Sequence, residues 1–262
     1  MLIGISGKMG AGKNLVCTII QGLTAAKKHN IENPSFEWIK KYYINSIWEQ
    51  KAFAGKLKQT ASLLTGIPVE KFENQEFKEK ALGPEWDRII SSDGNIHLPD
   101  DYPDLEYSKL TPRLLLQIIG TDCIRDRVHP NAWVNALFAD YKESPQNVLG
   151  KEGYKLEDVY PNWIITDMRF PNELEAIKSR EGITIRVNRP KNDLDNHKDC
   201  VKTEDGYCIQ SENNYCKGSC KYEHPSETSL DSATFDFVIS NDKDIEHLIN
   251  EVRKILEKLN II

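Results

Sequence analysis

The sequence predicts an α/β fold in which helices cover both faces of a mostly parallel, five-stranded β-sheet. Short apolar runs alternate along the chain with stretches of helical spacing, which is typical of a parallel sheet. The first apolar run also leads directly into a glycine-rich segment and then into a helix, as in sheets that bind ligands at the carboxyl ends of their strands. We expect one domain over residues 1–262, with insertions.

The first strand is expected over residues 2–5, and a phosphate-binding loop follows it. Residues 7–13 read Gly-Lys-Met-Gly-Ala-Gly-Lys and fit the spacing G-x-x-x-x-G-K. Glycines allow backbone conformations that turn consecutive N–H groups toward an anion, and the helix expected over residues 14–28 adds its positive N-terminal end. We expect Lys13 to reach the β- and γ-phosphates of a nucleotide. The alternative is a glycine-rich turn without a ligand, which the flanking strand and helix disfavour.

One position departs from this motif. Asn14 stands where a Ser or Thr hydroxyl usually binds Mg²⁺. An amide oxygen can also ligate a hard cation or hold one of its waters, because Mg²⁺ keeps several waters in such sites. We therefore expect nucleotide binding, and the sequence leaves direct ligation of Mg²⁺ by Asn14 open.

The middle of the chain is expected to hold one short strand and three helices. Thr111 can cap the second of these helices, Pro112 suits its first position and Gly120 is expected to end it. Before it, residues 67–110 are acidic and rich in turn signals, so we expect an insertion over the core. The strand is expected over residues 51–54, and the helices over residues 55–64, 111–119 and 131–141.

The last part of the chain repeats the alternation, and the first strand of this part ends at Asp167. A carboxylate at that edge of a parallel sheet is a candidate to hold a metal-bound water or to accept a hydrogen bond from a substrate, and a helix cap is the alternative. Arg169 is a candidate for a two-pronged phosphate contact or for a surface ion pair. The strands are expected over residues 163–166, 183–187 and 235–239, and the helices over residues 171–177 and 245–259.

Three arginines and a tryptophan are weaker candidates when taken by spacing alone. Arg113, Arg125 and Arg127 flank the segment at Gly120, and each could neutralise a phosphate, but exposed arginines are common and usually do little. Trp133 is suited to cover a base or ribose, although an aromatic residue at helical spacing is more often part of a core.

Composition argues against several kinds of partner. The net charge of −6 and a pI near 5.6 give no overall basic field for duplex DNA or an anionic membrane. No apolar stretch approaches the length of a membrane span, and no basic region precedes the first strand, so we expect no signal peptide. We therefore expect a cytoplasmic protein with small-molecule ligands.

A polar segment, residues 190–223, interrupts the alternation and holds four of the six cysteines. We expect it to be a lid, since it lacks periodic apolar residues. The cysteine spacing C-x7-C-x7-C-x3-C differs from the paired C-x2-C of common zinc ribbons, so free thiols in a flexible lid are favoured over a structural Zn²⁺. The lid cysteines are Cys200, Cys208, Cys216 and Cys220, whereas Cys17 and Cys123 are expected in the core.

Taken together, these motifs resemble those of the phage-type deoxynucleoside monophosphate kinases, a branch of the P-loop nucleoside monophosphate kinases. The block Leu-Gln-x-x-Gly-Thr-Asp at residues 116–122 and the block Asp-x-Arg at residues 167–169 are more specific than the glycine-rich loop. The resemblance extends along the whole chain, over residues 6–13, 53–58, 113–122, 131–134, 166–169 with Glu173, 187–190, 224–227 and 239–242.

This resemblance implies a three-layer α/β/α P-loop NTPase fold and gives roles to the matching residues. Lys13, Arg113, Asp167 and Arg169 are then expected to act in catalysis. One departure is Met9, near which relatives can carry a basic residue. The residues expected at ATP are Gly10, Gly12, Lys13, Asn14 and Leu15, and those expected at the acceptor are Leu57, Lys58, Arg113, Gly120, Thr121, Trp133, Asp167, Arg169 and Glu173.

The implied reaction converts ATP and a deoxynucleoside monophosphate (dNMP) to ADP and the diphosphate, with Mg²⁺. Catalysis then consists of aligning two phosphates and stabilising the transferring group. Two alternatives stay open: a kinase of another small acceptor, such as a dephospho-coenzyme precursor, and a nucleotide-binding regulator without transfer activity. The sequence also leaves open whether the protein is a homodimer.

Overall fold

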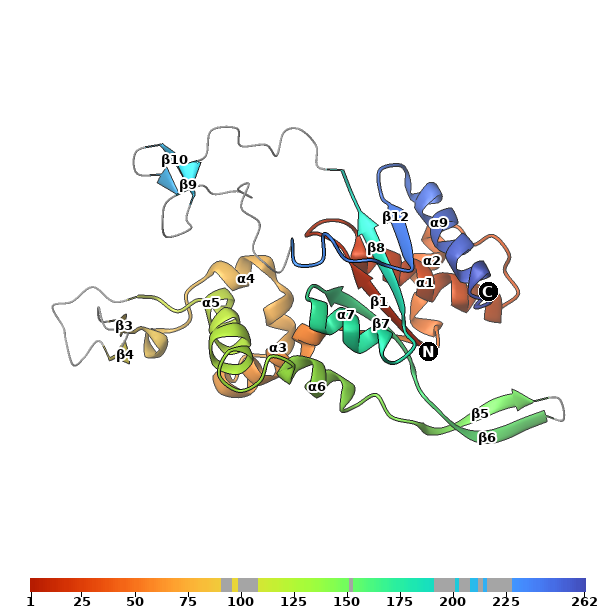
Figure 1. The fold of residues 1–262 in the computed structure, drawn as a ribbon, viewed down its shortest axis with the longest axis horizontal. Helices are drawn as coiled ribbons and strands as arrows, with labels where there is room; N and C mark the ends of the chain where they lie inside the picture. Colours follow the sequence, from red (N-terminus) through yellow and green to blue (C-terminus); the bar gives the residue numbers. More distant parts are fainter. Residues whose placement is uncertain are drawn as a thin grey trace. The chain divides into compact units, whose positions relative to one another are not determined.

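The computed structural model describes residues 1–90, 96–98, 108–150, 153–190, 201–202, 208–211, 214–215 and 228–262. The chain divides into two compact units, and Figure 1 labels most of their helices and strands. The first unit comprises residues 1–52 and 141–262, and the second comprises residues 53–140. The single kinase domain expected from the sequence stays a prediction.

The first unit is built on a five-stranded, all-parallel sheet, which confirms the predicted fold class. Strand β1 lies at its centre, because its apolar residues are buried on both faces. Ser6, the last residue of β1, pairs with Met168 on one neighbour and with Arg186 on the other, so these strands end at the same edge. The order is β12 (Phe237–Ser240), β8 (Ile183–Asn188), β1 (Leu2–Ser6), β7 (Asn162–Met168) and β2 (Trp48–Lys51).

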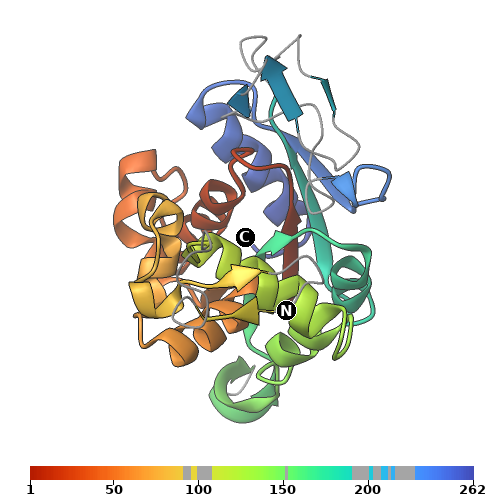
Figure 2. The same ribbon diagram turned by 90° about the vertical axis from the view of Figure 1, so that its left-hand side faces the viewer.

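Helices cover both faces of this sheet (Figure 2). The main core joins α1 (Lys13–Lys28) and α9 (Ile245–Lys258) to one face. On the other face lies α7 (Pro171–Lys178). Its residue Ile177 packs closely on Gly4 of β1, because a Cβ added at Gly4 would lie 2.4 Å from Ile177 Cδ1. The three-layer arrangement is the one that the resemblance implies.

The second predicted strand is displaced from its expected position. The sequence places a strand over residues 51–54, but β2 ends at Lys51 and α3 (Phe53–Thr65) begins two residues later. The ladder to β7 ends where Lys51 pairs with Ile165, and the Phe53 side chain is buried in the second unit. Tertiary burial of Phe53 therefore overrides its preference for a strand.

The second unit is helical, and the expected insertion contributes to its core. Phe72, from the insertion, is fully buried among Ala61, Leu115, Ile119 and Trp133. The main helices after α3 are α5 (Pro112–Gln117), η5 (Ile118–Arg125) and α6 (Ala132–Phe138). The described part of the insertion forms η2 (Val69–Glu73), α4 (Gln75–Glu79), η3 (Pro84–Trp86), β3 (Ile89–Ile90) and β4 (Ile96–His97).

The prediction that Gly120 ends a helix is wrong. α5 continues directly into the π-helix η5, and the Asp126 N–H donates to the Thr121 carbonyl at 3.0 Å. Gly120 is buried inside this turn, and a Cβ there would lie 2.9 Å from Cδ2 of Leu57. The glycine therefore permits the close approach of α3, and the helix ends beyond it.

Several elements of the first unit were not predicted. After α1 come α2 (Phe36–Tyr42) and η1 (Tyr43–Asn45), and an antiparallel hairpin joins β5 (Ser144–Gly150) to β6 (Gly153–Val159). The expected lid contains a small antiparallel sheet, consisting of β9 (Val201–Lys202), β10 (Cys208–Ser211) and β11 (Asn214–Tyr215).

The cysteines have mixed outcomes. Cys17 is buried as predicted, and burial raises the pKa of its thiol to about 12. The prediction for Cys123 is wrong, because its side chain is exposed on η5. Cys200, Cys216, Cys220 and the side chain of Cys208 lie outside the described residues, so the lid and its thiols stay predictions. Of the helices that the structure describes, none is long and apolar enough to cross a membrane.

The contact between α1 and α2 depends on a glycine. Gly22 of α1 faces Ile39 of α2, and a Cβ at position 22 would lie 2.5 Å from Ile39 Cγ2 and 3.0 Å from Ile39 Cβ. The second of these atoms is fixed to the backbone, so the side chain cannot rotate away.

We predict that Gly22→Ala destabilises the protein by about 1–3 kcal/mol through this overpacking, despite the better helix propensity of alanine. The matched control is Gly55→Ala in α3, where nothing lies within 4 Å of the added Cβ. The control should stabilise the protein by about 0.5–1 kcal/mol. Denaturant unfolding measures both, and a Gly22→Ala variant as stable as the parent would contradict the packing argument.

Candidate functional site

The loop between β1 and α1 is shaped as a phosphate-binding loop. Gly7 has φ 154°, and a Cβ there would lie 2.4 Å from the carbonyl oxygen of Val187, so the position requires glycine. The Lys13 ammonium turns back over the loop and donates to the carbonyls of Gly7 at 2.6 Å and Lys8 at 2.9 Å. A cation is thus held over the loop at the N-terminus of α1, where helix geometry favours an anion.

A pocket of about 730 Å³ adjoins this loop. Residues 8–11 line it together with residues 186–190 at the end of β8 and Ser240 at the end of β12. The Arg189 guanidinium donates to the Gly10 carbonyl at 3.4 Å. This volume lies within the usual range for small-molecule sites, and its lining includes three cationic side chains, those of Lys8, Arg186 and Arg189.

Arg186 is the most buried of these cations. Its guanidinium bonds Asp231 Oδ1 at 2.6 Å and Ser6 Oγ at 3.1 Å, which satisfies a charge that is costly to bury alone. The same Asp231 carboxylate lies 3.4 Å from the Lys8 ammonium through its other oxygen. Asp231 therefore connects the loop to β8.

Beside the loop, polar side chains from three elements meet. Gln50 Nε2 on β2 donates to Thr166 Oγ1 on β7 at 3.2 Å and to Asn14 Oδ1 on α1 at 3.4 Å. Asp167, half-buried, follows Thr166 on β7. Amide, hydroxyl and carboxylate oxygens, the ligands that Mg²⁺ prefers, are thus present at this edge of the sheet.

Arg169 and Glu173 are brought together at the start of α7. Glu173 is 3% exposed, and its Oε2 accepts the backbone N–H groups of Arg169 at 2.7 Å and Phe170 at 3.0 Å. This is half of a capping box, in which a carboxylate at the third helical position satisfies N–H groups before the helix. Glu173 therefore fixes the backbone that carries Arg169.

In the second unit, three predicted acceptor residues are in contact. The Trp133 indole N–H donates to the Gly120 carbonyl at 2.9 Å, and Gly120 lies against Leu57. Trp133 is 8% exposed and belongs to the core of this unit. Thr121 follows Gly120 in η5 and is half-buried.

The two predicted cations of the second unit each bond a glutamate. Lys58 lies 2.5 Å from Glu73, and Arg113 Nε donates to Glu79 at 2.6 Å. Lys78 of α4 was not predicted from the sequence, yet burial and the positive charges of Lys58 and Arg113 lower the pKa of its ammonium. The carboxylates of Glu73 and Glu79 act in the opposite direction on Lys78.

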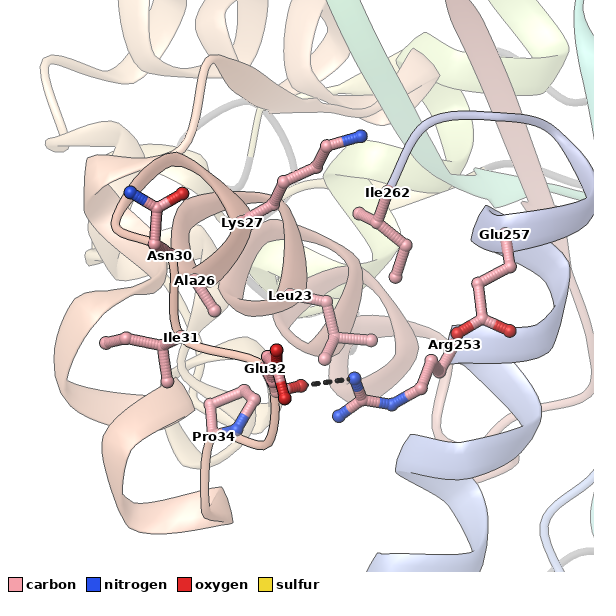
Figure 3. A pocket seen from close by; sticks show the side chains of 10 residues that line it. All are labelled: Leu23, Ala26, Lys27, Asn30, Ile31, Glu32, Pro34, Arg253, Glu257 and Ile262. Atoms are coloured by element: carbon pink, nitrogen blue, oxygen red, sulfur yellow. Dashed lines mark hydrogen bonds between the residues drawn. The ribbon is translucent and has the colours of Figure 1, made fainter.

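A second pocket in the first unit, of about 390 Å³, contains none of the predicted site residues (Figure 3). It lies at the C-terminal end of α1, and Arg253 donates across it to the Glu32 carbonyl at 2.6 Å. Because α1 starts at the loop, this pocket is remote from the carboxyl ends of the strands.

Comparison with known proteins finds similarity to one family of kinases. The model of the deoxynucleotide monophosphate kinase family matches residues 104–218. A candidate deoxynucleotide monophosphate kinase of Acanthamoeba polyphaga mimivirus is 24% identical over 257 residues, which cover 96% of this chain and 94% of that protein. The deoxynucleoside-5′-monophosphate kinase of Escherichia phage T5 is 22% identical over 218 residues, covering 68% of this chain and 72% of that protein.

The chain is similar to the deoxynucleotide monophosphate kinases. This confirms the resemblance drawn from the separate motifs. The phosphate-binding loop precedes the matched residues, and most of the acceptor candidates of this chain lie within them. The candidates within the match are Arg113, Gly120, Thr121, Trp133, Asp167, Arg169 and Glu173.

The bond between Trp133 and Gly120 predicts a stability effect that is separate from any contact with substrate. Trp133→Phe should destabilise the second unit by about 1–2 kcal/mol, because it leaves a buried carbonyl without its donor. The control Trp38→Phe changes a half-buried tryptophan on α2 and should have a smaller effect. Thermal unfolding followed by circular dichroism measures both, and equal stability of Trp133→Phe and the parent would refute the structural role.

Proposed function

We propose that the protein transfers the γ-phosphoryl group of ATP to the phosphate of a deoxynucleoside 5′-monophosphate. The observation that carries this proposal is the Lys13 ammonium held over a glycine loop, in a chain that the model of this kinase family matches over residues 104–218. The bond between the γ-phosphorus and the β-phosphate oxygen breaks, and a bond to an acceptor phosphate oxygen forms. ADP leaves with the electron pair on its β-phosphate oxygen.

The donor side belongs to the first unit. The loop N–H groups and the N-terminal end of α1 bind the β- and γ-phosphates, and Lys13 exchanges its two carbonyl contacts for phosphate oxygens. The loop residues that we assign to ATP are Gly10, Gly12, Lys13, Asn14 and Leu15. The adjoining basic pocket supplies Lys8 and Arg189 near the same phosphates.

Asn14 and Asp167 are the residues proposed to hold Mg²⁺ with its waters. Their oxygens suit a hard cation, and Gln50 ties Asn14 to the strand that carries Asp167. When bound, the ion would neutralise charge on the β- and γ-phosphates. Asn14 has a side-chain amide where a Ser or Thr would have a hydroxyl. The hydrogen bond from Gln50 to its Oδ1 orients this amide.

On the acceptor side, Arg113 and Arg169 are proposed to contact the dNMP phosphate. Each guanidinium offers two parallel donors to phosphate oxygens. Glu173 fixes the backbone of Arg169, and Glu79 holds Arg113 until substrate competes for it. The other residues assigned to this substrate are Leu57, Lys58, Gly120, Thr121, Trp133, Asp167 and Glu173.

The acceptor phosphate is already an anion, so transfer requires no strong general base. These residues then act by aligning two phosphates and by stabilising charge on the transferring group. Lid closure by residues 190–223 and a homodimer are further proposals. An ADP-release assay across dNMPs, ribonucleotides and other small acceptors tests the function. ATP turnover with only a different acceptor, or ATP binding without turnover, would overturn it.

The first test concerns Lys13. Lys13→Ala should lower kcat by about 10²-fold or more, because it removes a charge aimed at the transferring phosphates. The control Lys28→Ala removes an exposed lysine at the other end of α1 and should leave kcat unchanged. Turnover near that of the parent in a folded Lys13→Ala variant would refute the assignment.

The second test concerns the two arginines. Arg113→Lys and Arg169→Lys keep the charge but lose the planar fork, so KM for dNMP should rise about tenfold or more, with a smaller change in KM for ATP. Arg180→Lys is the control, because Arg180 is exposed and is not among the predicted site residues. A change confined to the ATP dependence would place these residues on the donor side.

A further inference from the structure

A side chain from the end of the last strand holds the phosphate-binding loop from outside. Asn241 follows β12 directly, and its Nδ2 donates to the Ala11 carbonyl of the loop at 2.9 Å. Its backbone N–H donates to the Asn188 carbonyl at the end of β8 at 2.7 Å. Asn241 is thus anchored to the sheet by its backbone while its side chain reaches the loop.

This bond fixes a peptide that matters for anion binding. In a trans peptide the C=O and N–H groups point in opposite directions, so the bond to the Ala11 carbonyl directs the Gly12 N–H away from Asn241. The Gly12 N–H is one of the loop donors that precede α1, and Lys13 is the next residue. Holding this one carbonyl therefore sets the direction of a donor at the base of the loop.

The same side chain explains the glycine at position 12. Gly12 has φ 100°, and a Cβ there would lie 2.5 Å from Asn241 Nδ2. The amide therefore packs directly against the loop backbone, and the left-handed conformation of Gly12 brings the two together. A larger residue at position 12 would displace Asn241 as well as strain the backbone.

We infer that Asn241 is a positioning residue for the donor nucleotide, which acts by holding the Ala11 to Gly12 peptide of the loop in its anion-binding orientation. It forms no part of the acceptor site and takes no part in the chemistry. The inference rests on the proposed donor site, because an oriented loop matters only if the loop binds the phosphates of ATP.

The first experiment compares Asn241→Ala and Asn241→Asp with the parent. Asn241→Ala removes the donor, and Asn241→Asp keeps the size but sets a carboxylate oxygen against the Ala11 carbonyl. Both should raise Kd and KM for ATP about tenfold or more, with KM for dNMP unchanged. Asp242→Ala, at the exposed neighbouring position, is the control and should leave Kd for ATP unchanged. Unchanged ATP affinity in both Asn241 variants would overturn the inference.

Hydrogen exchange of the nucleotide-free protein separates this inference from the proposed function. Peptides covering residues 7–13 should exchange faster in Asn241→Ala than in the parent, while peptides from β1 should not change. This readout needs neither ATP nor turnover. If the parent fails to bind ATP, the proposed function fails while the loop effect is still measured. Unchanged exchange of the loop would refute the holding role.

A double-mutant cycle with Gly12→Ala tests the contact itself. If Asn241 packs against Gly12, the loss of thermal stability caused by Gly12→Ala should be smaller in the Asn241→Ala background, because the clash with Nδ2 is removed. The strain of a positive φ is common to both backgrounds and cancels. Equal losses in the two backgrounds would show that the two residues are not coupled.

Discussion

The pairing of β1 with both β7 and β8 is the constraint on which the first unit depends. These three strands are buried between two helical layers, so their backbone N–H and C=O groups must be paired with neighbouring strands. A shift in the pairing register would also expose apolar residues. Because Ser6 pairs with both Met168 and Arg186, β1 and β7 end at one level, and β8 continues beyond that level to Asn188. The glycine loop, Arg169 and Arg189 are positioned by this register.

The glycine-rich loop is contacted by residues from other parts of the first unit. Val187 excludes a side chain at Gly7, Asn241 holds the Ala11 carbonyl, and Asp231 joins Lys8 to the buried Arg186. A glycine-rich loop loses much conformational entropy when it is ordered. Because these contacts already order the loop, they reduce the entropy cost of binding an anion. They come from positions far along the chain: Val187 lies in β8, Asn241 directly follows β12, and Asp231 lies in the segment before β12.

Sequence patterns predicted correctly those features that depend on residues close together in the chain. The loop motif, the helix that follows it and the apolar stripe of α9 were read from spacing, since neighbouring residues determine them. Sequence patterns gave wrong predictions where the burial of side chains determined the local structure. Phe53 is buried at the start of a helix instead of in its expected strand, Gly120 lies inside a π-helix with Leu57 packed against it, and Cys123 is exposed on the same element. Propensity is a weak prior, and tertiary contacts override it at such positions.

The sequence by itself determined the fold class, the phosphate-binding loop and the family resemblance, because these depend on short motifs and on the period of apolar residues. Only the tertiary structure decided that Glu173 fixes the backbone of Arg169, that Trp133 bonds Gly120 within a core, and that Asn241 bonds the loop. Asn241 and Ala11 are 230 positions apart in the chain. No local pattern relates two such residues, since their contact exists only after the parallel strands have aligned their carboxyl ends.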